Sequence, residues 1–192
     1  MILTTSYFPN ILYFSYIKDA ITSHDSLLIE RYENYQKQSY RNRCRIMGDK
    51  GCINLTIPVH AYNNIPVKDV TIYDSSWQRE HLRTIKTCYG SAPYFPYVID
   101  KIEDLFYIKG KWLIDLNNII LERLLSIINY DISIKFTKEF SPIVQNDSRL
   151  ITHRNYKSEY IFREYYQVFS EIQPFEPNLS IIDYLMCEGF SL

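Results

Sequence analysis

The sequence predicts an α/β protein with one domain over residues 1–192, a mixed sheet and several packing helices. Short apolar runs alternate with longer segments of helical periodicity. The sequence Gly48-Asp49-Lys50-Gly51 separates two alternating runs and indicates a β-hairpin near residues 43–59. With 192 residues, 46% of them hydrophobic, the chain is long enough to bury one core.

Each expected element follows from its local pattern. Short runs rich in apolar residues, bounded by turn residues, predict strands. Apolar residues at helical spacing predict helices, with Pro9, Pro93 and Pro96 marking starts. The stretch 144–157 is polar, contains Asn146-Asp147-Ser148 and is the best candidate for a mobile loop. In chain order, strands are expected at 1–4, 27–29, 43–46, 53–59, 68–72, 132–136 and 165–169, and helices at 9–20, 77–89, 95–107, 112–129 and 179–188.

Composition limits the class of protein. The net charge of −1 offers no global field for nucleic acid, so nucleic acid is not an expected partner. The four cysteines have no CxxC spacing and are expected to be reduced and mostly buried. The first twenty residues lack the basic start of a signal peptide, and no run reaches the roughly 20 apolar residues of a membrane span. We therefore expect a cytoplasmic protein.

Residues 33–46 combine aromatic, amide and cationic side chains. Four cations, Lys37, Arg41, Arg43 and Arg45, are opposed within the block by Glu33 alone. Such a mixture is typical of a site that binds an anionic or polyhydroxylated molecule. The candidate binding residues in this block are Tyr35, Lys37, Tyr40, Arg41, Asn42 and Arg43.

The hairpin gives these arginines a geometry. With Asp49-Lys50 at the centre of the turn, Ile46 faces Ile53 and Cys44 faces Leu55 on an apolar side. Arg45 then lies opposite Asn54, and Arg43 opposite Thr56. Alternation would place Arg41, Arg43 and Arg45 on one face, about 6.5–7 Å apart. Such a face holds either a bound anion or carboxylates from elsewhere in the chain.

A second cluster lies in the helix expected at 77–89. Trp77, Gln78 and His81 fall on its apolar stripe, together with Leu82, Ile85, Cys88 and Tyr89. His81 is either a hydrogen-bonded core residue or a general acid or base with a tuned pKa. Trp77 and Gln78 are further candidate binding residues.

Other signatures are absent or weak. No His or Cys pair has metal-ligand spacing, so no metal site is expected, and no cofactor is indicated. The sequence contains no GxSxG, P-loop or GxGxxG motif. Ser180 and Asp183 have the spacing of a capping pair for the last helix, although Asp183 could instead face a site.

Taken together, these segments resemble the WbqC-like protein family. The resemblance is carried by Tyr7–Phe14, Glu33–Ile46, Trp77–Phe95, Tyr166–Phe169 and Pro177–Gly189, with Tyr35–Arg43 as its most specific part. It implies a bacterial cytoplasmic protein of surface-polysaccharide or O-antigen biosynthesis. A transferase that moves an aminoacyl or acyl group to a sugar has been suggested for such proteins.

Two functional hypotheses follow. In the first, the protein is a transferase: His81 is the acid or base, and the cationic and aromatic residues bind an anionic or sugar-nucleotide substrate. In the second, the same residues form a non-catalytic module that binds an anion, a sugar nucleotide or a partner's acidic segment. The sequence leaves the donor, the acceptor and the oligomeric state open.

Overall fold

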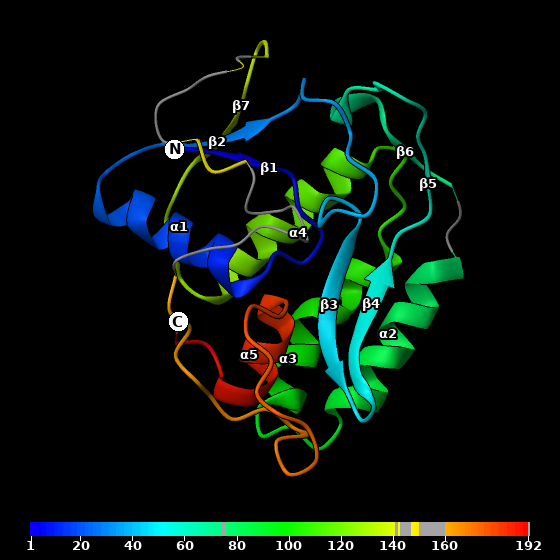
Figure 1. Ribbon diagram of the computed structural model, residues 1–192, viewed down its shortest axis with the longest axis vertical. Helices are drawn as coiled ribbons and strands as arrows, with labels where there is room; N and C mark the ends of the chain where they lie inside the picture. Colours follow the sequence, from blue (N-terminus) through cyan, green and yellow to red (C-terminus); the bar gives the residue numbers. More distant parts are fainter. Residues whose placement is uncertain (74–75, 141, 143–146, 150–159, 192) are drawn as a thin grey trace.

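The computed structural model describes residues 1–73, 76–140, 142, 147–149 and 160–191, and confirms the α/β class (Figure 1). Most of the predicted mobile loop, 144–157, lies outside the described residues. Within the described part of the chain, no helix is both long enough and apolar enough to cross a membrane.

A small parallel sheet joins strands from distant parts of the chain. Its order is β1 (Ile2–Thr4), β2 (Leu27–Glu30) and β7 (Ile134–Phe136). Helix α1 (Ile11–Thr22) connects the first two strands, and the Asn10 side chain caps it by accepting the Tyr13 N–H. Because the strands are parallel, their carboxyl ends meet at one edge of the sheet.

The hairpin has the predicted register. Strand β3 (Arg43–Gly48) pairs with β4 (Gly51–Thr56). Gly51 has φ +106°, which glycine adopts without steric cost, so the turn closes where the sequence indicated. The observed pairs are Arg43 with Thr56, Cys44 with Leu55, Arg45 with Asn54 and Ile46 with Ile53.

Several other predicted elements differ at their ends or are divided. Pro58 has no backbone N–H, and the expected strand 53–59 is divided there into β4 and β5 (Val59–His60). The expected strand 68–72 is a 3₁₀ turn, η1 (Val67–Asp69), followed by β6 (Thr71–Ile72), which pairs with β5. The helix expected at 95–107 is α3 (Phe95–Ile102) followed by the 3₁₀ segment η2 (Glu103–Tyr107).

The prediction of a strand at 165–169 is wrong. Residues 165–169 contain no strand, because the polar side chains of this segment bond to other parts of the fold. The Gln167 amide donates to the Glu176 carbonyl and accepts the Glu176 N–H, both at 3.0 Å. The Gln167 side chain thus bonds to both backbone groups of Glu176, as the backbone of a paired strand would.

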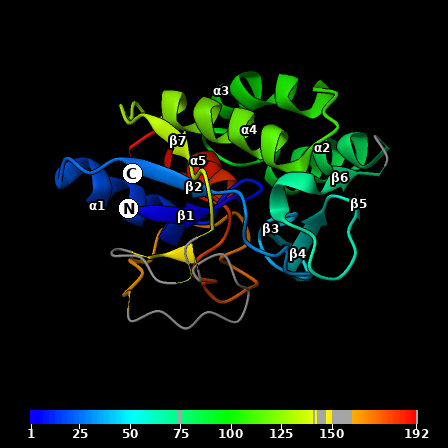
Figure 2. The ribbon, with the colours of Figure 1, turned by 90° about the horizontal axis from the view of Figure 1, so that it is seen from above.

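The remaining helices enclose the core. Figure 1 shows the β3–β4 hairpin between α5 and α2, and Figure 2 shows α3 and α4 along one side of the molecule. Helix α4 buries one broad side, which includes Leu113, Leu116, Ile120 and Leu124, and exposes the opposite side. The Ser180 side chain caps α5 by accepting the Ile182 N–H. The bounds are α2 (Ser76–Tyr89), α4 (Leu113–Ile127) and α5 (Ile181–Glu188).

Candidate functional site

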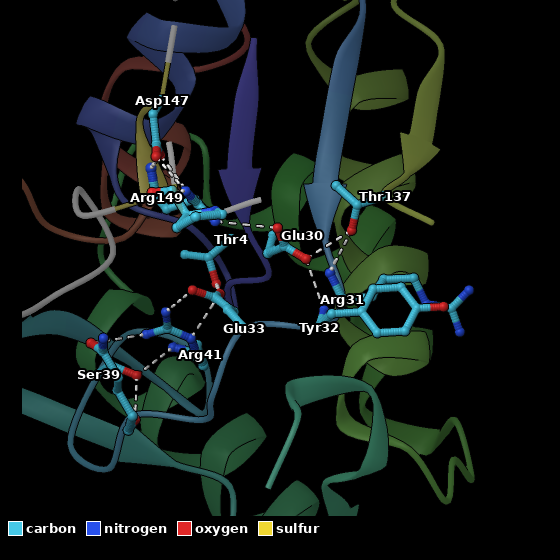
Figure 3. A network of polar contacts seen from close by, with 12 residues as sticks. Thr4, Glu30, Arg31, Tyr32, Glu33, Ser39, Arg41, Thr137, Asp147 and Arg149 are labelled. Carbon is cyan, nitrogen blue, oxygen red and sulfur yellow. Dashed lines mark hydrogen bonds and ion pairs between the residues drawn. The ribbon is translucent and has the colours of Figure 1, made fainter. Parts of the chain in front are cut away.

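Polar residues at the carboxyl ends of the parallel strands form a buried network (Figure 3). Thr4 ends β1, Glu30 ends β2, and Thr137 directly follows β7. Glu30 is fully buried and accepts hydrogen bonds from the Tyr32 N–H and the Thr137 hydroxyl, both at 2.8 Å. In open α/β sheets ligands usually bind at this edge, so the contacts made here decide whether the edge is available.

Arg41 is part of this network. It is only 1% exposed, and its Nε and Nη2 atoms lie 3.1 and 2.7 Å from the two carboxylate oxygens of Glu33. The Thr4 hydroxyl also donates to Glu33, and Gln36 lies 3.5 Å from Arg41 Nη1. The guanidinium fork that the sequence offers to a ligand is therefore occupied by a carboxylate of the same chain, as burial of the charge requires.

Arg149 forms the other half of the network. Its Nη1 lies 3.3 Å from Glu30 Oε2, and its Nε and Nη2 lie 2.9 and 2.5 Å from the oxygens of Asp147. The Arg149 hydrogen bonds lower the pKa of the Asp147 carboxyl. Ser148 N donates to the Ile2 carbonyl at 3.0 Å. The network therefore fixes residues 147–149 beside β1, and its ion pairs are satisfied within the protein.

The other two arginines of the block differ in their partners. Arg41 precedes β3, so strand alternation relates only Arg43 and Arg45. Arg45 forms an ion pair with Glu176 and donates to Cys52 Sγ at 3.2 Å. Arg43 is half-buried, and its Nε has no hydrogen-bond partner among the described residues. Burial raises the pKa of Tyr35 to about 12, although the charges of Arg43 and Arg41 oppose the shift.

The rest of the block mainly supports the backbone. Tyr40 is buried, and its carbonyl accepts the Tyr7 N–H at 2.9 Å. Asn42 Nδ2 donates to the Ile57 carbonyl at 2.8 Å, which holds the chain before β3 against the chain after β4. Lys37 is exposed to solvent. Among the predicted binding residues of this block, Lys37, Arg43 and Tyr35 therefore keep the most contact with the surface.

His81 lies in a buried aromatic cluster. Its Nδ1 lies 2.9 Å from the Tyr7 hydroxyl, and its ring centroid lies 5.1 Å from that of Trp77. Burial raises the pKa of Tyr7 well above its usual value, so the phenol is protonated and donates to Nδ1. The other side of the ring makes a hydrogen bond with the backbone of Thr56. Burial lowers the pKa of His81 from 6.5 to about 4, while the Thr56 bond opposes the shift, so the ring is neutral at pH 7.

Trp77 and Gln78 line a cavity of about 450 Å³ at the N-terminal end of α2. Gln78 Nε2 donates to the Ile108 carbonyl at 2.7 Å, which joins the helix to the loop before α4. Lys109 and Lys111 bring two cations to the lining, and none of its described residues is acidic. The described residues that line the cavity are Ile72, Tyr73, Trp77, Gln78, Ile108, Lys109, Gly110 and Lys111. This cavity therefore combines aromatic, amide and cationic groups.

The two lysines of this cavity were not among the residues predicted from the sequence. Lys109-Gly110-Lys111-Trp112 was the available signal, a short cationic–aromatic run between two helices. Lys111 Nζ lies 4.8 Å above the centroid of the Trp112 ring, and the Lys111 carbonyl accepts the Ile72 N–H at 2.9 Å. The cavity is thus assembled from three separate segments. By contrast, Arg41, Arg43 and Tyr35 do not line it.

Asp183 does not make the reciprocal capping bond that its spacing suggested. Its side chain is fully buried, and its oxygens accept from the Tyr89 and Tyr165 hydroxyls at 2.6 and 2.5 Å. Gln167 Nε2 donates to it at 3.3 Å. Burial raises the pKa of Asp183, and the three hydrogen bonds oppose the shift. Asp183 therefore anchors the segment at 165–167 against α5.

The thiols and acidic groups do not form a metal site in the described part of the chain. No cluster of three or more His, Cys, Asp or Glu side chains in that part could hold a metal ion. All four cysteines are free; Cys44, Cys88 and Cys187 are buried, and Cys52 is exposed.

Comparison with known proteins places the chain in a family. The family model described as "WbqC-like protein family" matches residues 5–156. The chain is 26% identical over 107 residues to "Uncharacterized protein Rv1507c" of Mycobacterium tuberculosis, which covers 55% of this chain and 45% of that protein. The match thus spans about half the length of this relative. No solved structure matches the chain significantly. The family match confirms the resemblance found in the sequence: the chain belongs to the WbqC-like protein family.

Proposed function

We propose that this chain binds an anionic sugar derivative, such as a sugar nucleotide, in the cavity lined by Trp77 and Gln78. The cavity's charge carries the proposal. Lys109 and Lys111 add two cations, no described lining residue is acidic, and Tyr73 and Trp77 supply aromatic surface. A phosphate would offset the lysine charges, and a base or sugar ring would pack against the aromatic side chains.

The first turn of α2 adds to this preference. Helix α2 has 14 residues, and its first turn contains no acidic side chain. Backbone N–H groups at a helix N-terminus favour anions. The cavity's volume of about 450 Å³ also lies within the range of about 300–1,000 Å³ for small-molecule sites.

The proposed reaction is transfer of an aminoacyl or acyl group to a sugar in bacterial surface-polysaccharide biosynthesis. It is supported by family membership and by the place of His81, one helical turn from the cavity residues Trp77 and Gln78. His81 is neutral at pH 7, which a general base requires. In this role Nδ1 would release its hydrogen bond to the Tyr7 hydroxyl and accept a proton from the substrate.

A non-catalytic binding module is the second candidate. It is favoured by the internal bonds of the two most specific candidates: Arg41 is paired with Glu33, and the Nδ1 of His81 is bonded to Tyr7. In this version the chain presents an anionic ligand to a partner and performs no transfer itself.

Binding is tested by calorimetric titration with nucleotide sugars at low ionic strength. The variant with Lys109→Ala and Lys111→Ala should bind at least about tenfold more weakly, because the cations that offset the phosphates are gone. The matched control carries Lys50→Ala and Lys135→Ala, two exposed lysines outside the cavity, and should bind as the parent does. Equal affinity for both double variants would exclude the cavity.

Turnover separates the two candidates. Purified protein is incubated with nucleotide sugars and aminoacyl or acyl donors, and products are detected by mass spectrometry. Product that disappears in His81→Gln, while ligand affinity is retained, supports the transferase with His81 as acid or base. Product formed equally by this variant refutes that role, and binding without any product supports the module.

A further inference from the structure

We propose a second small-molecule site, between α1, α5 and residues 160–165, that binds a neutral sugar ring. A cavity of about 440 Å³ lies there. Its described lining is Ile11, Ser15, Lys18, Tyr160, Phe162, Arg163, Glu164, Tyr165, Tyr184 and Glu188. It shares no lining residue with the lysine-lined cavity at α2, and the proposal is independent of the function proposed there.

The walls of this cavity follow from helical spacing. Ile11, Ser15 and Lys18 lie three and four residues apart and share one face of α1. Tyr184 and Glu188 are four residues apart on α5. The two helices lie on the same side of the molecule (Figure 1), and the Ile11 N–H donates to the Leu179 carbonyl at 3.1 Å just before α5. The helices therefore form a fixed groove.

The third wall is anchored by the buried carboxylate of Asp183. The Tyr165 hydroxyl donates to Asp183 at 2.5 Å, and the Tyr166 N–H donates to Glu188 at 3.1 Å. Tyr184 is held at its outer end, where its hydroxyl donates to the Ser191 carbonyl at 2.7 Å. These bonds preorganise the aromatic walls and reduce the ordering cost of binding.

Aromatic rings form much of the cavity surface. Tyr165 and Tyr184 pack edge to face with centroids 5.1 Å apart, and Tyr160 and Phe162 do so at 4.9 Å. An edge-to-face pair leaves a flat apolar face available for another ring. The C–H face of a pyranose has the shape and polarity to cover such a surface.

The charges of the lining select against an anion. Among the described lining residues, Lys18 and Arg163 are balanced by Glu164 and Glu188. A phosphate in this cavity would lie near two carboxylates with no excess cation to offset it. Arg163 brings donors and Glu164 brings acceptors to the lining. The Ser15 hydroxyl donates to the Leu12 carbonyl at 2.8 Å, and its oxygen can still accept a hydrogen bond. This combination matches sugar hydroxyl groups, which both donate and accept. A neutral polyhydroxylated ring fits this combination.

The proposal is tested by saturation-transfer NMR on the full chain. The probes are glucose, galactose, N-acetylglucosamine and rhamnose, with glucose 1-phosphate as the anionic comparison. We expect at least one neutral sugar to show saturable transfer. The affinity for that sugar should be at least tenfold lower in Tyr184→Leu. Tyr97→Leu changes an exposed tyrosine on α3 outside the cavity and should leave binding unchanged. Circular dichroism and thermal unfolding establish that both variants are folded.

Several results would overturn this site. No saturable transfer from any neutral sugar would do so, as would equal binding by Tyr184→Leu and Tyr97→Leu. Stronger binding of glucose 1-phosphate than of glucose in the parent and in the Lys109→Ala, Lys111→Ala variant would contradict the charge argument. Retained neutral-sugar binding in that double variant supports two separate sites, whether or not nucleotide sugars bind at α2.

Discussion

Protonation of His81 should make the fold less stable in mild acid. Folding lowers the pKa of this histidine from 6.5 to about 4, because the ring is buried between Tyr7 and Trp77. Between these two pH values the unfolded chain binds a proton that the folded protein excludes. The stability contributed by neutral His81 is therefore complete above pH 6.5 and is lost as the pH falls below it.

The magnitude follows from the two pKa values. The full difference between 6.5 and about 4 corresponds to about 3 kcal/mol at 1.36 kcal/mol per pKa unit. At pH 5 the linkage relation gives a loss of about 2 kcal/mol relative to pH 7.5. Since the side chain is only 6% exposed, solvent screening reduces this figure little.

The assay is urea unfolding at pH 7.5, 6.0 and 5.0, followed by tryptophan fluorescence. His81→Gln is less stable than the parent at pH 7.5, since it loses the packing of the ring, but it also lacks the titrating group. Its free energy of unfolding should therefore fall by about 2 kcal/mol less than that of the parent between pH 7.5 and 5.0. His60→Gln removes an exposed histidine on β5 and should follow the parent.

Carboxylates also titrate in this pH range, but they are the same in the parent and in His81→Gln. The difference between the two pH dependences of the unfolding free energy therefore reports on His81 alone. Parallel pH dependence for the parent and His81→Gln would refute the buried, neutral histidine. It would also remove the physical basis for a neutral base beside the α2 cavity.

Three further substitutions test the framework around the candidate sites by chemical denaturation. Arg41→Ala should cost about 3–5 kcal/mol, because Glu33 is left buried without its cation, and unchanged stability would show that the pair is dispensable. Gly189→Ala should cost about 1–3 kcal/mol, because φ is +85° and a Cβ would lie 2.8 Å from the Tyr94 ring; a variant as stable as the parent would contradict this contact. Asp183→Asn should cost about 1–3 kcal/mol, because an amide N–H₂ would face a hydroxyl donor, and a stable variant with unchanged tyrosine environments would argue against the anchor.

Local patterns were sufficient for much of the secondary structure. The register of β3 and β4 followed from Gly48–Gly51 and from two-residue alternation, and the Ser180 cap followed from its place before an apolar run. These features depend on residues close in the chain, whose geometry is set by backbone sterics and helical or strand period. Segment 165–169 failed as a strand because its aromatic pattern reflects contacts with Asp183, not pairing in a sheet.

The candidate site was less accessible to such reasoning. Trp77 and Gln78 were predicted from the sequence as candidate binding residues, and the cations predicted with them were the arginines at 41 and 43. In the fold, Trp77 and Gln78 share a cavity with Lys109 and Lys111 instead. The pairing of Arg41 with Glu33 depends on a loop that turns the two side chains toward each other under Thr4. Neither helix nor strand spacing encodes that approach.

The sequence by itself determined the family, the α/β class, the hairpin register and most helix positions, because these depend on local spacing and on a specific block of residues. Only the tertiary structure decided which charges are available. Packing brings Glu33 to Arg41 and Glu176 to Arg45, and it places Lys109 and Lys111 beside Trp77. A buried charge must find a partner wherever the fold supplies one, and that partner is set by contacts between segments far apart in the chain.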